Sequence, residues 1–328
     1  MTMKIGNIQV DHPFILAPLA GITDSTYRRL MKRHGASVVI SELISANAIH
    51  HTSLKTMDIM EFTEEERPIG IQIFGSEENL LLQAALCAQD KGADFIDINL
   101  GCSVPKVVKK GSGAALTHDL KKLTHILETL KKHLQIPLTI KIRLGWNENK
   151  QNAQEVTHIA QETGLNWVAI HGRYSEQMYS GLANWNAIAE IKANSTIPII
   201  GNGDITTPEI ALQRLQASKV DALMIGRACT VNPFIFQQML QYYQTGTYNI
   251  PTEQDLQNLI QEHKQLMQQE YHPMQILTLG RKYFSWYAAG KKDCRRFRNE
   301  LFRTQDLEKF WNIVETYFTP KQENNMGK

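Results

Sequence analysis

Residues 95–102 read FIDINLGC, a short apolar run that ends in polar residues, a glycine and a cysteine. Runs of the same kind, rich in Val, Ile and Leu, recur along the first part of the chain, with segments of helical pattern between them. Strands that are apolar on both faces and separated by helices are typical of a parallel sheet covered by helices. Eight such runs occur, at 14–21, 38–42, 69–75, 95–102, 138–146, 167–173, 198–205 and 222–228.

Eight strand–helix units in about 230 residues predict a closed TIM (β/α)8 barrel, and an open doubly wound sheet is the weaker alternative. After the eighth strand the alternation stops, and from Thr252 onward only helical patterns follow, at 252–271, 273–290 and 293–318. The polar stretch QTGTYNIP (244–251) separates the two regions. We therefore expect a catalytic α/β barrel over 1–244 and a small all-helical C-terminal domain over 245–328.

Composition is that of an ordinary globular chain. The 328 residues are 42% hydrophobic and carry a formal net charge of +2. The first residues have no charged-then-apolar signal pattern, and no long apolar stretch follows that would span a membrane. The cysteines are widely spaced, so neither a disulfide framework nor a metal site is expected. These features predict a cytoplasmic protein without a bound metal, and we expect a monomer.

Polar side chains stand at the carboxyl ends of the predicted strands, where a (β/α)8 barrel carries its active site. Lys141 lies inside an apolar strand, so a ligand or a buried carboxylate has to meet its charge. The turns NGD (202–204) and GR (226–227) contain glycines that let backbone N–H groups approach a phosphate, and Arg227 can add a forked contact. These residues indicate a phosphorylated ligand.

The ring portion of such a ligand would face Gln72, Lys141 and His171. A cation beside the pyrimidine edge of a flavin stabilises the anion formed on reduction, so these residues suggest FMN. Neither GxGxxG nor GxxxxGK[ST] occurs, which argues against a Rossmann or P-loop nucleotide site. Two structural alternatives stay open, because His171 can equally be a core histidine and the glycine turns can be ordinary tight turns of the barrel.

The cysteines differ in their surroundings. A lone buried cysteine usually acts as a small hydrophobic residue, and this is what we expect of Cys87 and Cys229. Cys102 instead follows the end of a strand, with Gly101 before it and Lys106 among the lysines after it. This position favours a functional thiol.

The segment 281–303 carries eight basic and two acidic residues, whereas residues 1–240 carry equal numbers of each. The basic residues alternate with aromatic ones, so a solvated amphipathic helix is the structural alternative. A local charge excess on an otherwise neutral protein also favours contact with a phosphate backbone. The candidate nucleic-acid-binding residues are Lys106, Arg281, Lys282, Lys291, Lys292, Arg295, Arg296 and Arg298.

Eight motifs stand in order at the predicted strand ends: APLAGITD (17–24), SELISANA (41–48), QIFGS (72–76), DINLGC (97–102), KIRLGW (141–146), IHGR (170–173), GNGDI (201–205) and MIGRA (224–228). Together they resemble the tRNA-dihydrouridine synthases, most closely the bacterial DusB type. The resemblance covers the whole barrel, and the helical tail stands where that family has its tRNA-binding domain.

This resemblance implies an FMN enzyme that uses NADPH to reduce the C5–C6 double bond of specific tRNA uridines to 5,6-dihydrouridine. The flavin N5 would deliver hydride to C6, and Cys102 would give a proton to C5. The residues that the resemblance assigns to FMN are Pro18, Leu19, Ala20, Gln72, Lys141, His171, Asn202, Gly203, Asp204, Gly226 and Arg227.

Two positions depart from the family pattern. Ser103 stands where the family commonly has proline, so the loop after Cys102 can take another shape, and Leu19 replaces a methionine of similar volume. Two other functions stay open. An FMN-dependent small-molecule reductase of the dihydroorotate dehydrogenase or enoate reductase type would not need the basic tail, and a non-catalytic RNA-binding barrel would not need a flavin.

Overall fold

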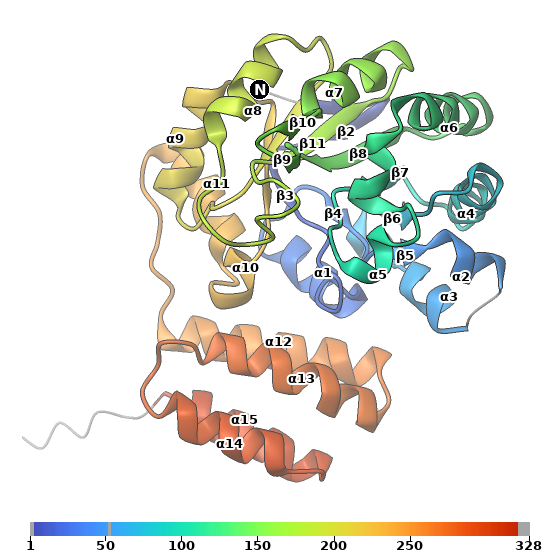
Figure 1. Cartoon of the computed structure of the whole chain (residues 1–328). Helices are drawn as coiled ribbons and strands as arrows, with labels where there is room; N and C mark the ends of the chain where they lie inside the picture. Colours follow the sequence, from blue (N-terminus) through green and yellow to red (C-terminus); the bar gives the residue numbers. More distant parts are fainter. Residues whose placement is uncertain (1–2, 52–53, 321–328) are drawn as a thin grey trace, which may run out of the picture.

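Eight parallel strands form a ring in the computed structural model, which describes residues 3–51 and 54–320 (Figure 1). In ring order each strand pairs with the next along the chain, β13 pairs with β3, and a bridge between Ile15 and Val38 joins β3 to β4. The ring is therefore closed, and the predicted (β/α)8 barrel is confirmed. The strands are β3 (Phe14–Leu16), β4 (Val39–Ile40), β6 (Ile69–Phe74), β7 (Phe95–Leu100), β8 (Leu138–Arg143), β11 (Trp167–His171), β12 (Ile199–Asn202) and β13 (Ala222–Ile225).

Helices surround the ring and return the chain to the amino end of each following strand. The helix α9 illustrates the local chemistry, because Thr207 caps its first turn by accepting from the Ile210 N–H and Pro208 fills its first position. The helices of the barrel region are α1 (Ser25–Arg33), α2 (Ala46–His50), α3 (Leu54–Met60), α4 (Glu78–Asp90), α5 (Pro105–Val108), α6 (Leu120–His133), α7 (Ala153–Glu162), α8 (Trp185–Ala193), α9 (Pro208–Ser218), α10 (Ala228–Val231) and α11 (Ile235–Thr245), with 3-10 turns at Glu64–Glu66 and Gly113–His118.

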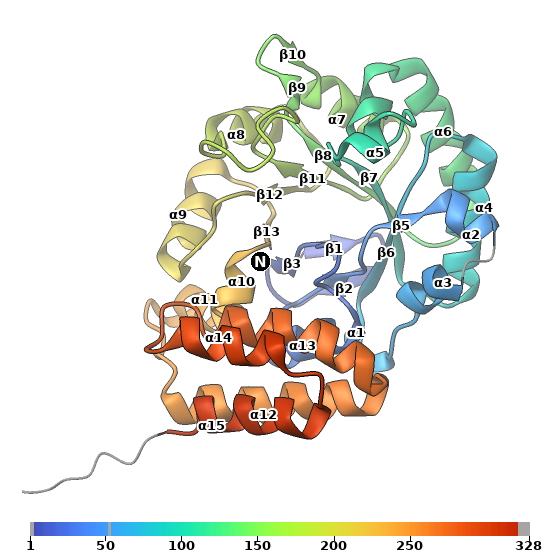
Figure 2. The ribbon, with the colours of Figure 1, turned by 60° about the horizontal axis from the view of Figure 1, so that its bottom comes forward.

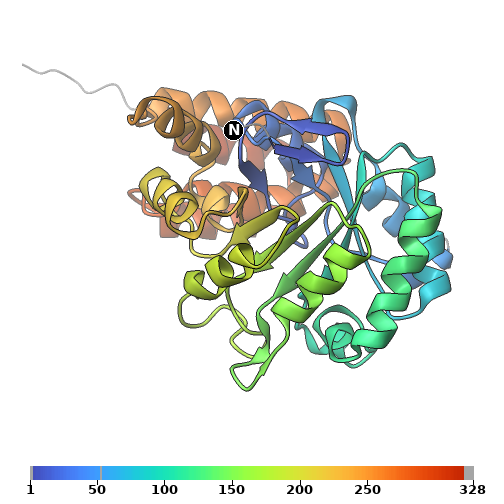
Figure 3. The same ribbon diagram turned by 90° about the horizontal axis from the view of Figure 1, so that it is seen from above.

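Short strands outside the ring do not belong to the predicted pattern. The strands β1 (Met3–Ile5) and β2 (Ile8–Val10) form an antiparallel hairpin at the amino end of the barrel (Figure 3). Ile5 and Val10 are buried there, in one cluster with Phe95 and Trp167 of the barrel interior. A second hairpin, β9 (Gly145–Asn147) with β10 (Lys150–Gln151), follows β8, and β5 (Ile44–Ser45) pairs with β6.

Within the described part of the chain, up to residue 320, four helices follow the barrel and form a separate layer beside it (Figure 1). They are α12 (Glu253–Glu270), α13 (Pro273–Tyr287), α14 (Cys294–Arg303) and α15 (Leu307–Phe318). The single helical segment expected over 293–318 is wrong, because α14 ends at Arg303 and a new cap forms at Asp306, which accepts from the Lys309 N–H at 2.7 Å. Among the described residues, no helix is both long and apolar enough to cross a membrane.

The helical layer contacts the barrel through α1, α10 and the loop that follows β3 (Figure 2). Tyr283 of α13 stacks on Tyr27 of α1 with a centroid distance of 5.2 Å, and its hydroxyl donates to the carbonyl of Ile22 at 2.7 Å. At the edge of this contact, Arg29 pairs with Glu270 at 2.7 Å. Tyr283 of the segment 281–303 therefore forms part of the contact between helices and barrel, whereas Phe284 and Phe297 pack within the helical layer.

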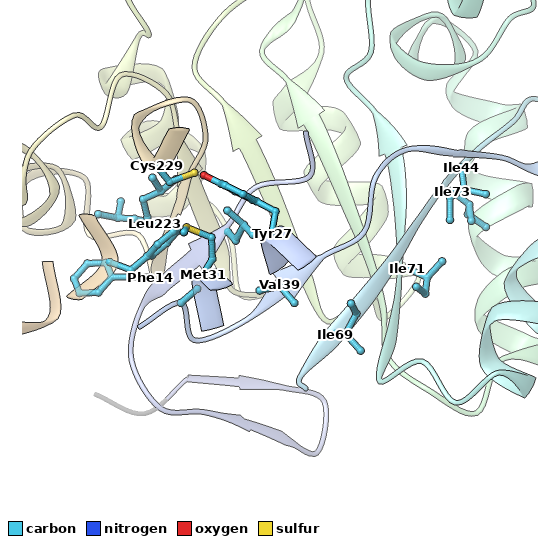
Figure 4. Packing of buried hydrophobic residues seen from close by; sticks show 14 of the residues in the cluster. Phe14, Tyr27, Met31, Val39, Ile44, Ile69, Ile71, Ile73, Leu223 and Cys229 are labelled. Carbon is cyan, nitrogen blue, oxygen red and sulfur yellow. The ribbon is translucent and has the colours of Figure 1, made fainter. Parts of the chain in front are cut away.

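The core around α1 shows what the buried cysteine does. Cys229 lies beside Tyr27, Met31 and Leu223 in a buried cluster (Figure 4), and burial raises the pKa of its thiol to about 12. Cys87 packs against the same core from α4. Both cysteines occupy the structural positions that the sequence predicted for them.

Candidate active site

A cavity of about 760 Å³ opens at the carboxyl ends of the barrel strands. All the residues that the sequence predicted for a flavin line this cavity, together with Cys102. They are Pro18, Leu19, Ala20, Gln72, Lys141, His171, Asn202, Gly203, Asp204, Gly226 and Arg227. The structure thus brings together residues that are spread over more than two hundred positions of the chain.

Strand alternation explains why these side chains point inward. Successive side chains of a strand face opposite sides, so Thr139, Lys141 and Arg143 of β8 share one face. Across the sheet, Asp97 is the register partner of Thr139, and Asn99 is the partner of Lys141. Each strand therefore sends its alternate residues into the barrel, and the row nearest the carboxyl end is polar.

Lys141 aims its charge into the cavity without a close anionic partner. Its Nζ lies 3.4 Å from Oδ1 of Asn202, and no ion pair to Lys141 occurs among the described residues. Burial lowers the pKa of Lys141 to about 8, and the neighbouring Arg143 adds to the effect. A buried cation with one long contact is suited to a ligand that brings electron density to the site.

His171 is held neutral by its surroundings. Burial, followed by repulsion from the cations Lys141, Arg143 and Arg173, lowers the pKa of His171 to about 2. The Nη1 of Arg173 lies 3.3 Å from Nε2 of His171. Because a guanidinium only donates, Nε2 has to accept, and the ring proton then resides on Nδ1.

Arg173 also organises the turn after β12. Its Nη2 donates to Oδ1 of Asp204 at 2.8 Å and to the carbonyl of Gly181 at 2.7 Å. The other oxygen of Asp204 accepts from the N–H of Ala183 at 2.8 Å. The Asp204 carboxylate is therefore engaged with the protein, and only its backbone N–H is suited to a phosphate. Arg173 was not among the predicted ligand residues, although it shares an inward face of the sheet end with His171.

The loop that carries Cys102 is fastened by side chains of two strands. Oδ1 of Asn99 accepts from the N–H groups of Gly101 at 3.2 Å and Cys102 at 2.9 Å. Nε of Arg143 donates to the carbonyl of Gly101 at 3.1 Å. The thiol is half-buried and lines the cavity. After Ser103, the short helix α5 begins with Pro105 at its first position, so a proline does stiffen this loop, two residues later than the family pattern has it.

The rim of the cavity carries an aromatic residue that sequence reasoning missed. Tyr179 is 58% exposed, and the guanidinium of Arg227 lies 4.7 Å from its ring centroid. Arg143 donates to the carbonyl of Met178 at 2.8 Å and so holds this loop against β8. No motif marks Tyr179, because its loop lies between a strand and a helix and has no periodic pattern.

The predicted nucleic-acid-binding residues fall into two groups. Three of them hold the fold together: Arg281 donates to the carbonyl of Thr304, Arg298 donates to that of Ser285, and Lys282 donates to the carbonyl of Gly21 at the cavity loop. The others lie on α5 and around α14: Lys106, Lys292, Arg295 and Arg296 are exposed, and Lys291 is half-buried. A shallow hollow of about 470 Å³ runs along α14 between its arginines.

The fold and the cavity define a (β/α)8-barrel enzyme with a cation-rich site at the carboxyl ends of its strands. The family profile of dihydrouridine synthase (Dus) matches residues 15–322, so the chain belongs to this family. It is 34% identical to tRNA-dihydrouridine synthase B of Pseudomonas aeruginosa over 99% of this chain and 98% of that one. It is 35% identical to tRNA-dihydrouridine synthase B of Shewanella oneidensis, over 98% of this chain and all of that one. The predicted family resemblance is confirmed.

Solved structures of lower sequence identity share the fold. Histamine dehydrogenase from Rhizobium sp. 4-9 aligns with a TM-score of 0.61 at 12% identity, over 97% of this chain and 63% of that one. A 2-naphthoyl-CoA reductase aligns with a TM-score of 0.58 at 14% identity, over 73% of this chain and 51% of that one. At this level of identity the likeness extends to the architecture alone.

Proposed function

We propose that the protein is a tRNA-dihydrouridine synthase that binds FMN and uses NADPH to reduce the C5–C6 double bond of specific tRNA uridines. The observation that carries the proposal is the meeting of the Cys102 thiol with the predicted flavin residues in one cavity. The family membership of the whole chain supports the same reaction. We further propose the cytoplasm as the place of action and a monomer as the active form, with the barrel over 1–244 catalytic and the helices over 245–328 binding RNA.

The residues of the cavity fit a flavin phosphate. Gly203 has a φ of +130°, and a Cβ there would lie 2.6 Å from that of Ala183, so only glycine keeps this backbone open. At Gly226 a Cβ would lie 3.9 Å from its nearest neighbours, Ala17 and Leu19, so the backbone is uncrowded on that side and a phosphate oxygen can approach it. Arg227 at the start of α10 supplies an exposed cation beside this turn. Lys141 would meet the electron-rich edge of the flavin ring.

When bound, the flavin supplies the hydride for the uracil ring. Cys102 can supply the proton, because a thiol is mostly protonated at neutral pH and yet far more acidic than a hydroxyl. His171 stays neutral and therefore offers a hydrogen bond rather than a charge. Lys141 stabilises negative charge that develops beside it.

The RNA has to bring its uracil into the cavity. A base leaves its stack at a cost of a few kcal/mol, and the cost is lowest in an unpaired loop, such as the D-loop of a tRNA. The exposed cations on α5 and around α14 are suited to the phosphate backbone, while Tyr179 offers an aromatic face at the rim. The barrel then performs the reduction, and the helices hold the RNA.

The test is mass spectrometry of nucleosides from tRNA after incubation with the flavin-loaded protein and NADPH. Unmodified transcripts and tRNA from cells that lack dihydrouridine are the substrates. We expect a gain of two hydrogens on a uridine. If a yellow protein oxidises NADPH but changes neither RNA, a small-molecule reductase explains the site better. If the protein binds no flavin and still binds tRNA, a non-catalytic RNA-binding barrel explains it better.

A further inference from the structure

The carboxylate of Asp97 is completely buried in the barrel, and the function proposed above gives it no part. It lies beneath the cavity, in one row of register partners with Gln72 on β6 and Thr139 on β8. Both neighbours donate to it, Gln72 Nε2 to Oδ2 at 2.6 Å and Thr139 Oγ1 to Oδ1 at 2.6 Å. A carboxylate at this depth needs such donors, because burial without them costs several kcal/mol.

An ionised carboxylate only accepts hydrogen bonds, and this fixes the polarity of everything above it. Gln72 has to turn its NH2 group toward Asp97, so its Oε1 faces Asn99 and accepts from Nδ2 at 2.9 Å. Asn99 then has its Oδ1 left for the N–H groups of Gly101 and Cys102. A series of hydrogen bonds therefore runs from the N–H groups of the thiol loop through Asn99 and Gln72 to Asp97, with each group donating toward Asp97, and Thr139 donates to Asp97 from the other side.

We propose that Asp97 is a positioning residue, which sets the orientation of the Gln72 and Asn99 amides and thereby holds the loop that carries Cys102. The proposal rests on the proposed function only in the role of Cys102 as proton donor. Asp97 touches no residue of the loop itself and acts through two amides that each have one donating and one accepting end. Its charge fixes the accepting end of the series, since neither Gln72 nor Thr139 is restricted to accepting, and the backbone N–H groups of Gly101 and Cys102 form the donating end.

The test reverses the direction of hydrogen-bond donation between Asp97, Gln72 and Asn99. In an Asn99→Asp variant two oxygens face each other, because Gln72 keeps its NH2 group on Asp97, and the side chain at position 99 loses the partner that orients it toward the loop. In the double variant Asp97→Asn/Asn99→Asp the hydrogen bonds between positions 97, 72 and 99 can all reverse. The new amide at position 97 donates to Gln72 Oε1, and Gln72 donates to the new carboxylate at position 99. That carboxylate still accepts from the N–H groups of Gly101 and Cys102. The number of carboxylates is unchanged.

The readout is the rate at which iodoacetamide alkylates Cys102 in the flavin-loaded protein, without RNA or NADPH, measured by peptide mass spectrometry. We expect Asn99→Asp to raise the rate at Cys102 by about tenfold, as for the loss of a buried hydrogen bond. In the double variant the alkylation rate at Cys102 is expected to lie within about twofold of its value in the unsubstituted protein. The rates at Cys87 and Cys294 serve as internal references.

A double variant that is alkylated as fast as Asn99→Asp overturns the proposal. If Asn99→Asp raises the alkylation rate of the buried Cys229 as much as that of Cys102, the proposal is also overturned, because loss of the fold would then explain the result. If the variants do not fold, amide exchange in the unsubstituted protein decides: exchange at Cys102 as fast as at Ser103 contradicts a loop held by Asn99. Because no turnover is measured, this outcome is independent of the test of the proposed function.

Discussion

Cys102 is the single side chain on which the proposed chemistry depends. Replacing it with alanine is expected to lower dihydrouridine formation by at least about a hundredfold, because general acid catalysis contributes factors of that size. Oxidation of NADPH by the flavin should continue, since the thiol does not hold the flavin residues. Single-turnover reduction of tRNA, beside NADPH oxidation without RNA, measures both. Cys294→Ala is the matched control, and an equal loss there would contradict the assignment.

His171 makes stability depend on pH. Its pKa is about 2 in the fold, against 6.5 for a free histidine, because of burial and nearby cations. Since the unfolded chain takes up the proton first, the stability due to neutral His171 is complete above pH 6.5 and is lost as the pH falls toward 2. At pH 5 the loss is on the order of 2 kcal/mol.

Urea unfolding of the flavin-free protein at pH 7 and pH 5 checks this expectation. The variant His171→Gln keeps a polar side chain and has no proton to gain, so its stability should fall less over the same interval. If the free energy of unfolding falls equally in the two proteins between pH 7 and pH 5, His171 is already protonated in the folded state, which contradicts the effect of burial and nearby cations described above.

At the scale of single residues, the sequence predicted which side chains line the cavity, but it did not predict the protein groups with which they pair. Lys141 was predicted as a site residue because a charge inside an apolar strand is costly to bury unless a ligand or a carboxylate meets it. Asp97 was not found as part of the site, because a buried acid in a motif looks the same whether it meets a ligand or another side chain. Lys282 was predicted to bind RNA, yet it donates to the carbonyl of Gly21 in the loop after β3. The two residues are 261 positions apart in the sequence, so no local pattern could reveal this contact.

The turns after β12 and β13 are the elements whose geometry matters most for the cofactor. Gly203→Ala is expected to destabilise the fold by about 2 kcal/mol or more, since its φ is +130° and the new Cβ would meet Ala183 at 2.6 Å. Gly226→Ala should leave the flavin-free protein as stable as before, because the nearest atoms are 3.9 Å away. It should still weaken FMN binding by on the order of tenfold, because a methyl group keeps the phosphate from the backbone.

Thermal unfolding without flavin and fluorescence titration with FMN separate the two effects. Gly246→Ala is the control for backbone strain alone, since that glycine has a φ of +75° and no atom within 4 Å of a new Cβ. If Gly203→Ala costs no more stability than Gly246→Ala, the predicted clash with Ala183 is not present in solution.

Element prediction succeeded where hydrophobic pattern and burial agree. All eight barrel strands are apolar runs, and each lies within its predicted range. The Ser76 hydroxyl, in contrast, has the chemistry of a helix cap but donates to the carbonyl of Lys110, and α4 begins two residues later. The break between α14 and α15 was missed because Thr304 and Asp306 lie in an amphipathic pattern that continues across them. The outer hairpins have too few residues for a periodic signal.

The distribution of charge over the whole molecule predicts how it holds RNA. Replacing Lys292, Arg295 and Arg296 with glutamate is expected to weaken tRNA binding and to lower the slope of log K against log salt by about 2, through the loss of phosphate contacts. NADPH oxidation without RNA should not change. Filter binding at several salt concentrations measures the slope.

The matched control changes the same number of charges at the other end of the barrel. Lys4, Lys132 and Lys219 are exposed and precede or flank the amino ends of the strands, away from the cavity. Their replacement by glutamate alters the net charge equally and should alter the salt slope less. Equal slopes in the two triple variants would show that overall charge, rather than the surface at α14, determines binding.

The hairpin β1–β2 has a consequence for the order of events in turnover. Ile5 and Val10 fill the amino end of the barrel, so reactants have to enter and leave the chamber by its mouth. If NADPH is the electron donor, as proposed above, it and the uridine share this single mouth, and we expect the oxidised nicotinamide to leave before the uridine binds. Steady-state rates measured against both reactants should then give parallel lines in double-reciprocal plots, and intersecting lines would mean that both are accommodated at once.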